Sequence, residues 1–438
     1  MELRDSRTPS LSALDVEYAD EPSTDWGLAT RRLLTGDDHV PDVVAPPEGH
    51  PRFVLLDGVR AVAALAILVT HAAFASGGSS AWYGRFAARL DVGVAIFFAL
   101  AGFLLFRPYV AEHLDHVRAP AFRRYWFRRG LRIVPAYWLA LTLLLILGLI
   151  TLDSRWWEHY GLVQIYDRYE VLGGNVGAWS LAVELSFYLA LPLAVLAMRS
   201  PRFGADRRSR VRGAALLVAG IWFAGVAFRL IAHGYTGSRA SIAYDTLFAH
   251  LDWFAIGMGL AVLSAAMAGG SARPASVAWI EEHAGLTWLA ALAVFVYVSV
   301  GLGVSGNWSE PHGTFGWLMM HVLYGVIAGL LLAPAIFPGA RRSLVHDFLG
   351  HPVVGGLGVI SYGVFLYNGP IAAWLGRSKL SGLWAGRPFY GIVLATLVLS
   401  ITAAVFSYRL VERPLLRFKD WRPEPATARS PEPAPPAG

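Results

Sequence analysis

The chain has 438 residues, of which 55% are hydrophobic and only 16% are charged, and its formal net charge is +6. A soluble domain carries about 25% charged residues, so this composition excludes an ordinary water-soluble enzyme and a disordered chain. The chain has no cysteine, which excludes disulfide scaffolds, cysteine-ligated metal centres and a thiol nucleophile. Only Lys379 and Lys419 are lysines, and this preference for arginine is typical of a GC-rich genome.

Both ends of the chain differ from its hydrophobic body. Residues 1–50 contain eleven acidic residues, four arginines and no apolar run, which is typical of a disordered segment. Residues 419–438 are rich in proline and alanine and also lack a core pattern. We therefore expect a disordered acidic cytosolic tail over 1–50, a membrane domain over 51–418 and a second disordered cytosolic tail over 419–438.

The membrane domain contains apolar windows for about ten transmembrane helices. A helix that crosses a bilayer needs about 20 mainly apolar residues, and open strands cannot satisfy their backbone groups in lipid. The windows lie at about 53–73, 91–110, 133–152, 179–198, 212–232, 243–267, 285–305, 315–337, 353–376 and 387–410. The sequence therefore predicts an all-α integral membrane protein.

Arginines in the loops predict how the helices are oriented. The loops after the even-numbered windows hold sixteen arginines, whereas the loops after the odd-numbered windows hold eight basic residues. Loops rich in positive charge tend to stay in the cytoplasm. We therefore expect a multi-pass protein of the cytoplasmic (inner) membrane of a bacterium, with both termini in the cytoplasm.

The first predicted helix carries two ionisable residues that share one face. Arg60 and His71 are eleven positions apart, which places them about 16 Å apart along the helix axis, with His71 nearer the outer surface. Charges in a membrane span are costly, so both are functional candidates. The alternative is that Arg60 reaches the inner headgroups and His71 lies in water at the helix end.

The fourth predicted helix places Glu184 close to the expected depth of His71. A carboxylate beside an imidazole can orient that ring as a general base. The alternative is a structural polar link between two helices. A further polar group on the fifth and sixth helices is expected to form a structural ion network: Arg229, Tyr244, Asp245, His250 and Asp252.

A basic segment with interleaved aromatic residues precedes the third helix, reading Arg-Arg-Tyr-Trp-Phe-Arg-Arg-Gly-Leu-Arg-Ile over residues 123–133. Arginines hold phosphates through bidentate hydrogen bonds, and aromatic rings can lie beneath a purine. Arg129 and Arg132 share one helix face. The alternative is that these arginines orient the protein and contact anionic lipid.

Several familiar catalytic motifs are missing from the chain. It contains no Walker A loop, no Gly-x-Ser-x-Gly elbow and no His-Glu-x-x-His sequence. The sequence therefore does not favour nucleotide-driven phosphotransfer, serine hydrolysis or zinc proteolysis, and we expect no metal cofactor.

Six ordered segments carry a family resemblance: 56–71, 91–104, 129–138, 179–192, 360–370 and 407–414. Together they resemble the acyltransferase-3 family of integral membrane enzymes, which O-acylate surface glycans, glycolipids and some macrolides. Two positions depart from the family pattern. The Leu-Trp-His-Trp-Pro motif of the ninth helix is here Leu-Tyr-Asn-Gly-Pro, so that Asn368 replaces a histidine, and the Arg-Leu-Asp motif of the sixth helix begins with His250.

The resemblance implies transfer of an acyl group, in most members acetyl, from acyl-CoA to a hydroxyl of a saccharide, glycolipid or polyketide-glycoside acceptor. It implies that the pair of Arg60 and His71 is essential and that His71 is the base. It also implies that acyl-CoA docks from the cytosol on arginines of the basic segment, which we take to be Arg124, Arg128, Arg129 and Arg132.

These inferences combine into one mechanistic hypothesis. The pantetheine arm passes Arg60 and brings the thioester to His71, which accepts the proton of the acceptor hydroxyl while Glu184 orients its ring. Transfer through an acyl-imidazole on His71 is the rival route. The expected substrate contacts are Asp57, Tyr188, Tyr362 and Asn368, of which the last three are candidate oxyanion donors.

Two other classes of function stay open. The chain could be a transporter whose buried charges gate a substrate, or a non-catalytic subunit of an envelope complex in which His71 and Glu184 only link helices. The lipid bilayer is an expected partner in every case and nucleic acid in none, and homo-oligomerisation is left open.

Overall fold

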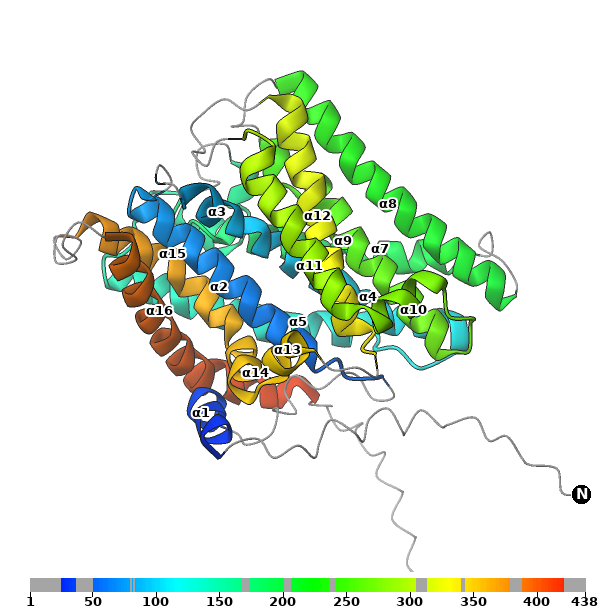
Figure 1. Cartoon of the computed structure of the whole chain (residues 1–438). Helices are drawn as coiled ribbons and strands as arrows, with labels where there is room; N and C mark the ends of the chain where they lie inside the picture. Colours follow the sequence, from blue (N-terminus) through cyan, green and yellow to red (C-terminus); the bar gives the residue numbers. More distant parts are fainter. Residues whose placement is uncertain are drawn as a thin grey trace, which may run out of the picture.

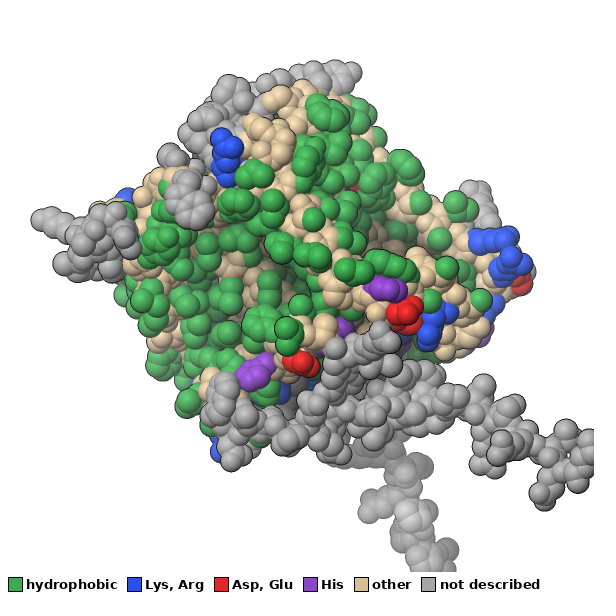
Figure 2. Space-filling view, viewed as in Figure 1, with side chains coloured by type: hydrophobic (Ala, Val, Ile, Leu, Met, Phe, Trp, Pro, Cys, Tyr) green, Lys and Arg blue, Asp and Glu red, His purple; other side chains and the backbone are tan. Residues whose placement is uncertain are grey.

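The computed structural model describes residues 25–36, 50–78, 81, 83–167, 173–200, 206–236, 242–304, 313–339, 343–378 and 388–420. Every regular element in these ranges is a helix, and nine helical segments are long and apolar enough to cross a membrane. The predicted all-α membrane class is therefore confirmed. The helices form one bundle (Figure 1). Figure 2 shows hydrophobic side chains across the middle of one face, with charged side chains nearer its margins.

Five of the nine segments are single helices: α2 (Leu55–Ala75), α5 (Phe122–Ile146), α7 (Ala178–Met198), α8 (Arg207–Thr236) and α12 (Thr314–Ile336). Four join neighbouring helical elements: α3 (Gly84–Arg89), η4 (Leu90–Val92) and α4 (Gly93–Asp115); η8 (Leu247–His250) and α9 (Leu251–Ala268); α11 (Ala284–Val296) and η9 (Tyr297–Gly301); α16 (Pro388–Ser407), η11 (Tyr408–Glu412) and α17 (Arg413–Leu416). The other elements are α1 (Asp25–Thr35), α6 (Trp156–Tyr160), η5 (Gln164–Tyr166), η7 (Ile242–Asp245), α10 (Ala275–Glu282), α13 (Leu344–Gly350), α14 (Pro352–Val359), α15 (Ser361–Arg377) and η12 (Arg417–Asp420).

The window predicted at 353–376 is not one continuous helix. It consists of α14 and α15, which meet at Ile360, where the backbone leaves helical geometry at φ −89° and ψ 4°. The glycines of α14 allow it to press against the start of α2: a Cβ atom on Gly358 would lie 1.9 Å from the carbonyl oxygen of Asp57. This close approach fixes the direction of α14, and α15 then continues along α2 (Figure 1).

The acidic segment predicted to be disordered contains α1. This helix packs against α14, and Arg409 of η11 donates hydrogen bonds to the carbonyl oxygens of Arg32 and Leu33. The prediction of disorder is therefore wrong for residues 25–36, because the average composition of the tail hides a short segment with apolar side chains such as Leu34, which packs on the core. Residues 1–24, 37–49 and 421–438 lie outside the described ranges.

The centre of the bundle is the contact between α4 and α9, where two backbones approach through glycine. A Cβ atom on Gly257 would lie 1.8 Å from the carbonyl oxygen of Ala99, and one on Gly102 would lie 2.2 Å from that of Phe254. The Phe254 ring stacks on Phe98 of α4, with centroids 4.5 Å apart. Small residues permit such close helix packing within membranes.

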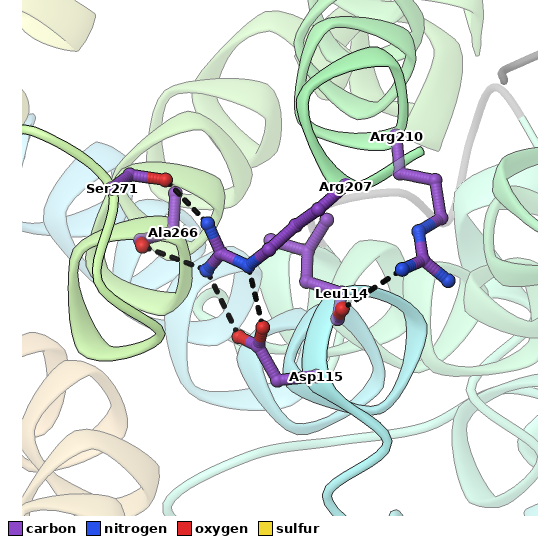
Figure 3. A network of polar contacts seen from close by, with 6 residues as sticks. All are labelled: Leu114, Asp115, Arg207, Arg210, Ala266 and Ser271. Carbon is purple, nitrogen blue, oxygen red and sulfur yellow. Dashed lines mark hydrogen bonds and ion pairs between the residues drawn. The ribbon is translucent and has the colours of Figure 1, made fainter. Parts of the chain in front are cut away.

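A polar clamp joins α4, α8 and α9 at one end of the bundle (Figure 3). Arg207, the first residue of α8, donates to both carboxylate oxygens of Asp115 at 2.6 and 3.1 Å. The same guanidinium donates to the hydroxyl of Ser271 at 2.5 Å and to the carbonyl oxygen of Ala266 at 2.9 Å. Bidentate arginine–carboxylate pairs are geometrically specific, so this residue fixes how the three helix ends meet.

We predict that Gly257→Ala destabilises the protein by about 1–3 kcal/mol, the usual cost of overpacking a core. The added methyl group would collide with the backbone of Ala99, which cannot move independently of α4. The measurement is thermal unfolding of the purified protein in detergent. Gly220→Ala on α8 is the matched control, because a Cβ atom there meets nothing within 4 Å. Equal melting temperatures for Gly257→Ala and the wild type would contradict the prediction.

Candidate functional site

A cavity lies between α2, α4, α5, α7 and α15. Its polar wall includes several side chains that the sequence singled out: Arg60, Arg129, Arg132, Glu184, Tyr188 and Tyr362. The remaining wall is mainly apolar and includes Phe97, Leu100 and Leu104. The cavity can therefore hold a ligand that has both a charged and an apolar part.

The polar wall is lined by three arginines and one glutamate. Arg60, Arg129 and Arg132 all interact electrostatically with Glu184. The Nε atom of Arg129 is buried and has no hydrogen-bond partner among the described residues. A buried N–H group that lacks an acceptor is costly, so this wall is suited to an anionic ligand.

Helical spacing places these side chains on shared faces. Asp57 and Arg60, three residues apart on α2, form an ion pair of 3.1 Å. Tyr188 follows Glu184 by four residues on α7 and donates a hydrogen bond to its carboxylate. The Arg129 guanidinium lies 5.9 Å from the centre of the Tyr188 ring. Residues three and four apart face the same way on a helix, and this local rule accounts for the pairs Asp57–Arg60 and Glu184–Tyr188, whereas Arg129 and Tyr188 come from different helices.

His71 lies outside the lining of the cavity and pairs with α15. Its Nδ1 atom is hydrogen-bonded to the Oδ1 atom of Asn368. A Cβ atom on Gly369 would lie 3.3 Å from the His71 ring, so α15 packs closely on this histidine. The predicted pairing of His71 with Glu184 is therefore wrong.

The depth at which α7 begins explains this difference. Asn175, just before α7, donates a hydrogen bond to the carbonyl oxygen of Leu366 at 2.9 Å, and Gly177 lies against Phe365. Thus α7 begins level with the turn of α15 that precedes Asn368. Glu184 lies six residues farther along α7, about 9 Å deeper, where it meets Arg60 instead of His71.

The three candidate oxyanion donors are engaged within the protein. The Tyr188 hydroxyl donates to Glu184, and the Tyr362 hydroxyl donates to the carbonyl oxygen of Ile133 at 2.9 Å. The Asn368 amide nitrogen donates to the carbonyl oxygens of Val364 and Phe365 at 3.0 and 3.2 Å. None of these groups is oriented in this structure as an oxyanion donor would need to be.

Phe97 of α4 and Phe365 of α15 form an aromatic pair in the cavity wall. Their ring centroids are 6.3 Å apart. Phe365 precedes Asn368 by three residues on α15, about 4.5 Å along the helix axis. The apolar end of the cavity therefore reaches to within about one helical turn of the residue that holds His71.

Besides His71 and Asn368, three predicted site residues lie outside the cavity lining: Asp57, Arg124 and Arg128. Arg124 and Arg128 lie on the first two turns of α5 and are partly exposed. Asp57 is nearly buried, and it pairs with Arg52 at 3.6 Å as well as with Arg60. Its charge is therefore neutralised by the protein.

Three of the residues expected to form an ion network, Arg229, His250 and Asp252, make hydrogen bonds in this structure. Arg229 bonds to the Nε2 atom of His250 at 3.2 Å and to the carbonyl oxygen of Ala249 at 3.0 Å. Asp252 pairs instead with His321 of α12 at 2.9 Å, a residue that the sequence reasoning missed. A search for every ionisable residue in a predicted span would have found His321. Within the described ranges, no group of three or more metal-binding side chains converges.

Comparison with known proteins identifies the family. Residues 53–409 match the family model described as the acyltransferase domain, the acyltransferase-3 type. A Bacillus subtilis (strain 168) protein provisionally named peptidoglycan O-acetyltransferase YrhL is 26% identical over 389 residues, which are 84% of this chain and 55% of the relative. The O-acetyltransferase OatA of Staphylococcus aureus (strain NCTC 8325 / PS 47) is 22% identical over 385 residues, which are 83% of this chain and 57% of OatA.

The chain thus spans a little more than half the length of these relatives. No solved structure matches it. The family model covers most of the chain and includes every helix that lines the cavity, which confirms the resemblance seen in the sequence motifs. The chain belongs to the acyltransferase-3 family of membrane proteins.

Proposed function

We propose that the protein is a membrane O-acyltransferase, which moves an acetyl group from acetyl-CoA to a hydroxyl of a saccharide or glycolipid of the cell envelope. The observation that carries this proposal is the amphipathic cavity. Its arginine-rich wall suits an anionic donor, and its apolar end lies about one turn from the residue that holds His71. The names of the relatives support acetyl as the group and a glycan as the acceptor.

The donor would bind with its phosphates on the arginines of α5. Arg129 and Arg132 line the cavity, while Arg124 and Arg128 extend the same helix outward to meet the nucleotide. Arg60 would contact the pantetheine arm, and the negative charge of Glu184 would offset the mutual repulsion of the arginines in the absence of donor. The acyl end would then lie at Phe97 and Phe365, whose rings must part to admit it to His71.

His71 would act as the general base. It accepts the proton of the acceptor hydroxyl as that oxygen attacks the thioester carbonyl carbon. A carbon–oxygen bond forms and the carbon–sulfur bond breaks, so the acetyl group moves and a CoA thiolate leaves. The imidazolium then returns the proton to that thiolate, which leaves His71 neutral for the next cycle.

We also propose that the α5 arginines, and with them both termini, face the cytoplasm of the inner membrane. The excess of arginines in the even-numbered loops supports this orientation, because basic loops are retained in the cytoplasm. A cytoplasmic donor and an envelope acceptor would then approach the site from opposite sides.

We expect the double change Arg129→Ala and Arg132→Ala to weaken acetyl-CoA binding at least tenfold. A hydrogen bond to a charged group is worth about 1.5–3 kcal/mol, and two such groups are removed. The measurement is the Kd of acetyl-CoA for the purified protein in nanodiscs. Arg273→Ala is the matched control, since Arg273 is exposed and pairs only with Glu281. Unchanged affinity in the double variant would place the donor elsewhere.

His71→Ala should lower the rate of CoA release from acetyl-CoA, in the presence of soluble peptidoglycan fragments, by about 10²–10⁴-fold, the usual contribution of a positioned general base. A thiol-reactive dye reports the released CoA. His283→Ala is the control, because His283 stacks on Trp279, which does not line the cavity. A folded His71→Ala protein with wild-type turnover would eliminate His71 as the base.

The cysteine-free chain allows a direct test of orientation. Ser154 and Ala272 are both exposed, in loops predicted to face outward and inward. A membrane-impermeant maleimide should label Ser154→Cys in intact spheroplasts, but should label Ala272→Cys only after permeabilisation. The reverse pattern would invert the proposed topology.

A further inference from the structure

Asn368 is buried completely, and all of its polar atoms are engaged. Its relative exposure is 0%. The amide nitrogen donates to the carbonyl oxygens of Val364 and Phe365, and the amide oxygen contacts the Nδ1 atom of His71. This side chain therefore joins the backbone of α15 to the imidazole on α2.

The two backbone carbonyls determine which way the amide points. A carbonyl oxygen can only accept a hydrogen bond, so the atom of Asn368 that faces Val364 and Phe365 must be the NH₂ group. The remaining atom, which faces His71, is then the carbonyl oxygen. Because this oxygen has no proton to give, the hydrogen bond requires a proton on the Nδ1 atom of His71.

We propose that Asn368 is a positioning residue that holds neutral His71 with its proton on Nδ1. The lone pair then lies on Nε2, and this nitrogen would take the proton of the acceptor hydroxyl. In the wrong tautomer, with the proton on Nε2, the same ring could not act as that base. This inference rests on the proposed function, because it assigns a task to a partner of the proposed base.

Packing restricts the orientation of the His71 ring as well. A Cβ atom on Gly369 would lie 3.3 Å from both the Nδ1 and Cε1 atoms of His71, and 2.8 Å from Val176. The turn 368–369 therefore holds the ring by a hydrogen bond at one residue and by close contact at the next. No titratable side chain of α15 or of the segment before α7 takes part in these contacts.

The electrostatic setting of His71 is neutral. Among the described residues, no charged group interacts with the ring, and Asn368 is its one side-chain hydrogen-bond partner. An asparagine fixes the tautomer as a carboxylate would, but gives the imidazolium no negative charge. Exchanging the amide for a carboxylate is therefore a test of this contact, because it adds a charge at that position.

The experiment compares pH–rate profiles of CoA release from acetyl-CoA with soluble peptidoglycan fragments. Asn368→Ala should lower kcat at least tenfold without changing the KM for acetyl-CoA, since loss of the tautomer-fixing partner costs up to about 10⁴-fold in a serine protease triad. Asn368→Asp should move the acid limb of the profile upward by about 1–3 pH units, because an adjacent negative charge stabilises the imidazolium. The base then becomes protonated at a higher pH than in the wild type.

A matched control separates this role from a structural one. Asn175 is also buried, and it bonds to the same helix through the carbonyl oxygen of Leu366, but among the described residues no hydrogen bond joins it to His71. Asn175→Asp should leave the acid limb at the wild-type position even if it lowers stability. Asn368→His places a ring with one donor and one acceptor at this position, and it should restore kcat to within a few-fold of the wild type.

The outcomes separate this inference from the proposed function. If His71→Ala is inactive while Asn368→Asp leaves the acid limb unmoved and Asn368→Ala keeps full kcat, then His71 is the base and the role of Asn368 is refuted. If His71→Ala retains wild-type activity, the proposed function itself fails. If Asn368→Asp does not fold, the other two variants test the role of Asn368. A low kcat in Asn368→Ala together with a kcat near the wild-type value in Asn368→His supports that role, and an unchanged kcat in Asn368→Ala refutes it.

Discussion

Every ionisable side chain buried between these helices must find its partner inside the protein, because lipid offers none. Most of them do. Asp57 pairs with Arg60, Asp252 with His321, and Arg107 donates to the hydroxyl of Ser264 at 2.9 Å. In the cavity wall, by contrast, the Arg129 Nε atom is buried and has no acceptor among the described residues. An anionic ligand in the cavity would supply that acceptor.

Sequence reasoning succeeded where the governing rule is local. Span length and hydropathy depend on about 20 consecutive residues, so the all-helical membrane class could be predicted. The shared face of Arg129 and Arg132 was predicted from their spacing of three. The same rule accounts for the pairs Asp57–Arg60 and Glu184–Tyr188, which the sequence analysis did not single out. The convergence of α2, α5 and α7 at one cavity could be expected only from the family resemblance, because no local rule brings separate helices together.

The predictions that were wrong concern the depth at which a residue lies in the bundle and the side chain with which it pairs. Both depend on contacts between segments that are distant in the sequence. A sequence gives the order of residues along α7, but not the level at which that helix begins. Here the bond from Asn175 to Leu366 fixes that level, and it moves Glu184 away from His71. Likewise, the break between α14 and α15 depends on how closely Gly358 approaches α2, and composition alone did not reveal α1.

His71 is bonded to the neutral amide of Asn368 and not to the carboxylate of Glu184 that was predicted as its partner, and this has a consequence for the proposed chemistry. A neutral amide does not stabilise the imidazolium that forms when the acceptor is deprotonated, so the positive charge is favoured only while a negative charge is nearby. During acyl transfer, that negative charge develops first on the tetrahedral intermediate and then on the leaving CoA thiolate. The proton would therefore pass to the thiolate as it leaves. With no cysteine in the chain, no protein thiolate would compete for either the proton or the acyl group, so the acyl group would not pass through a protein thioester.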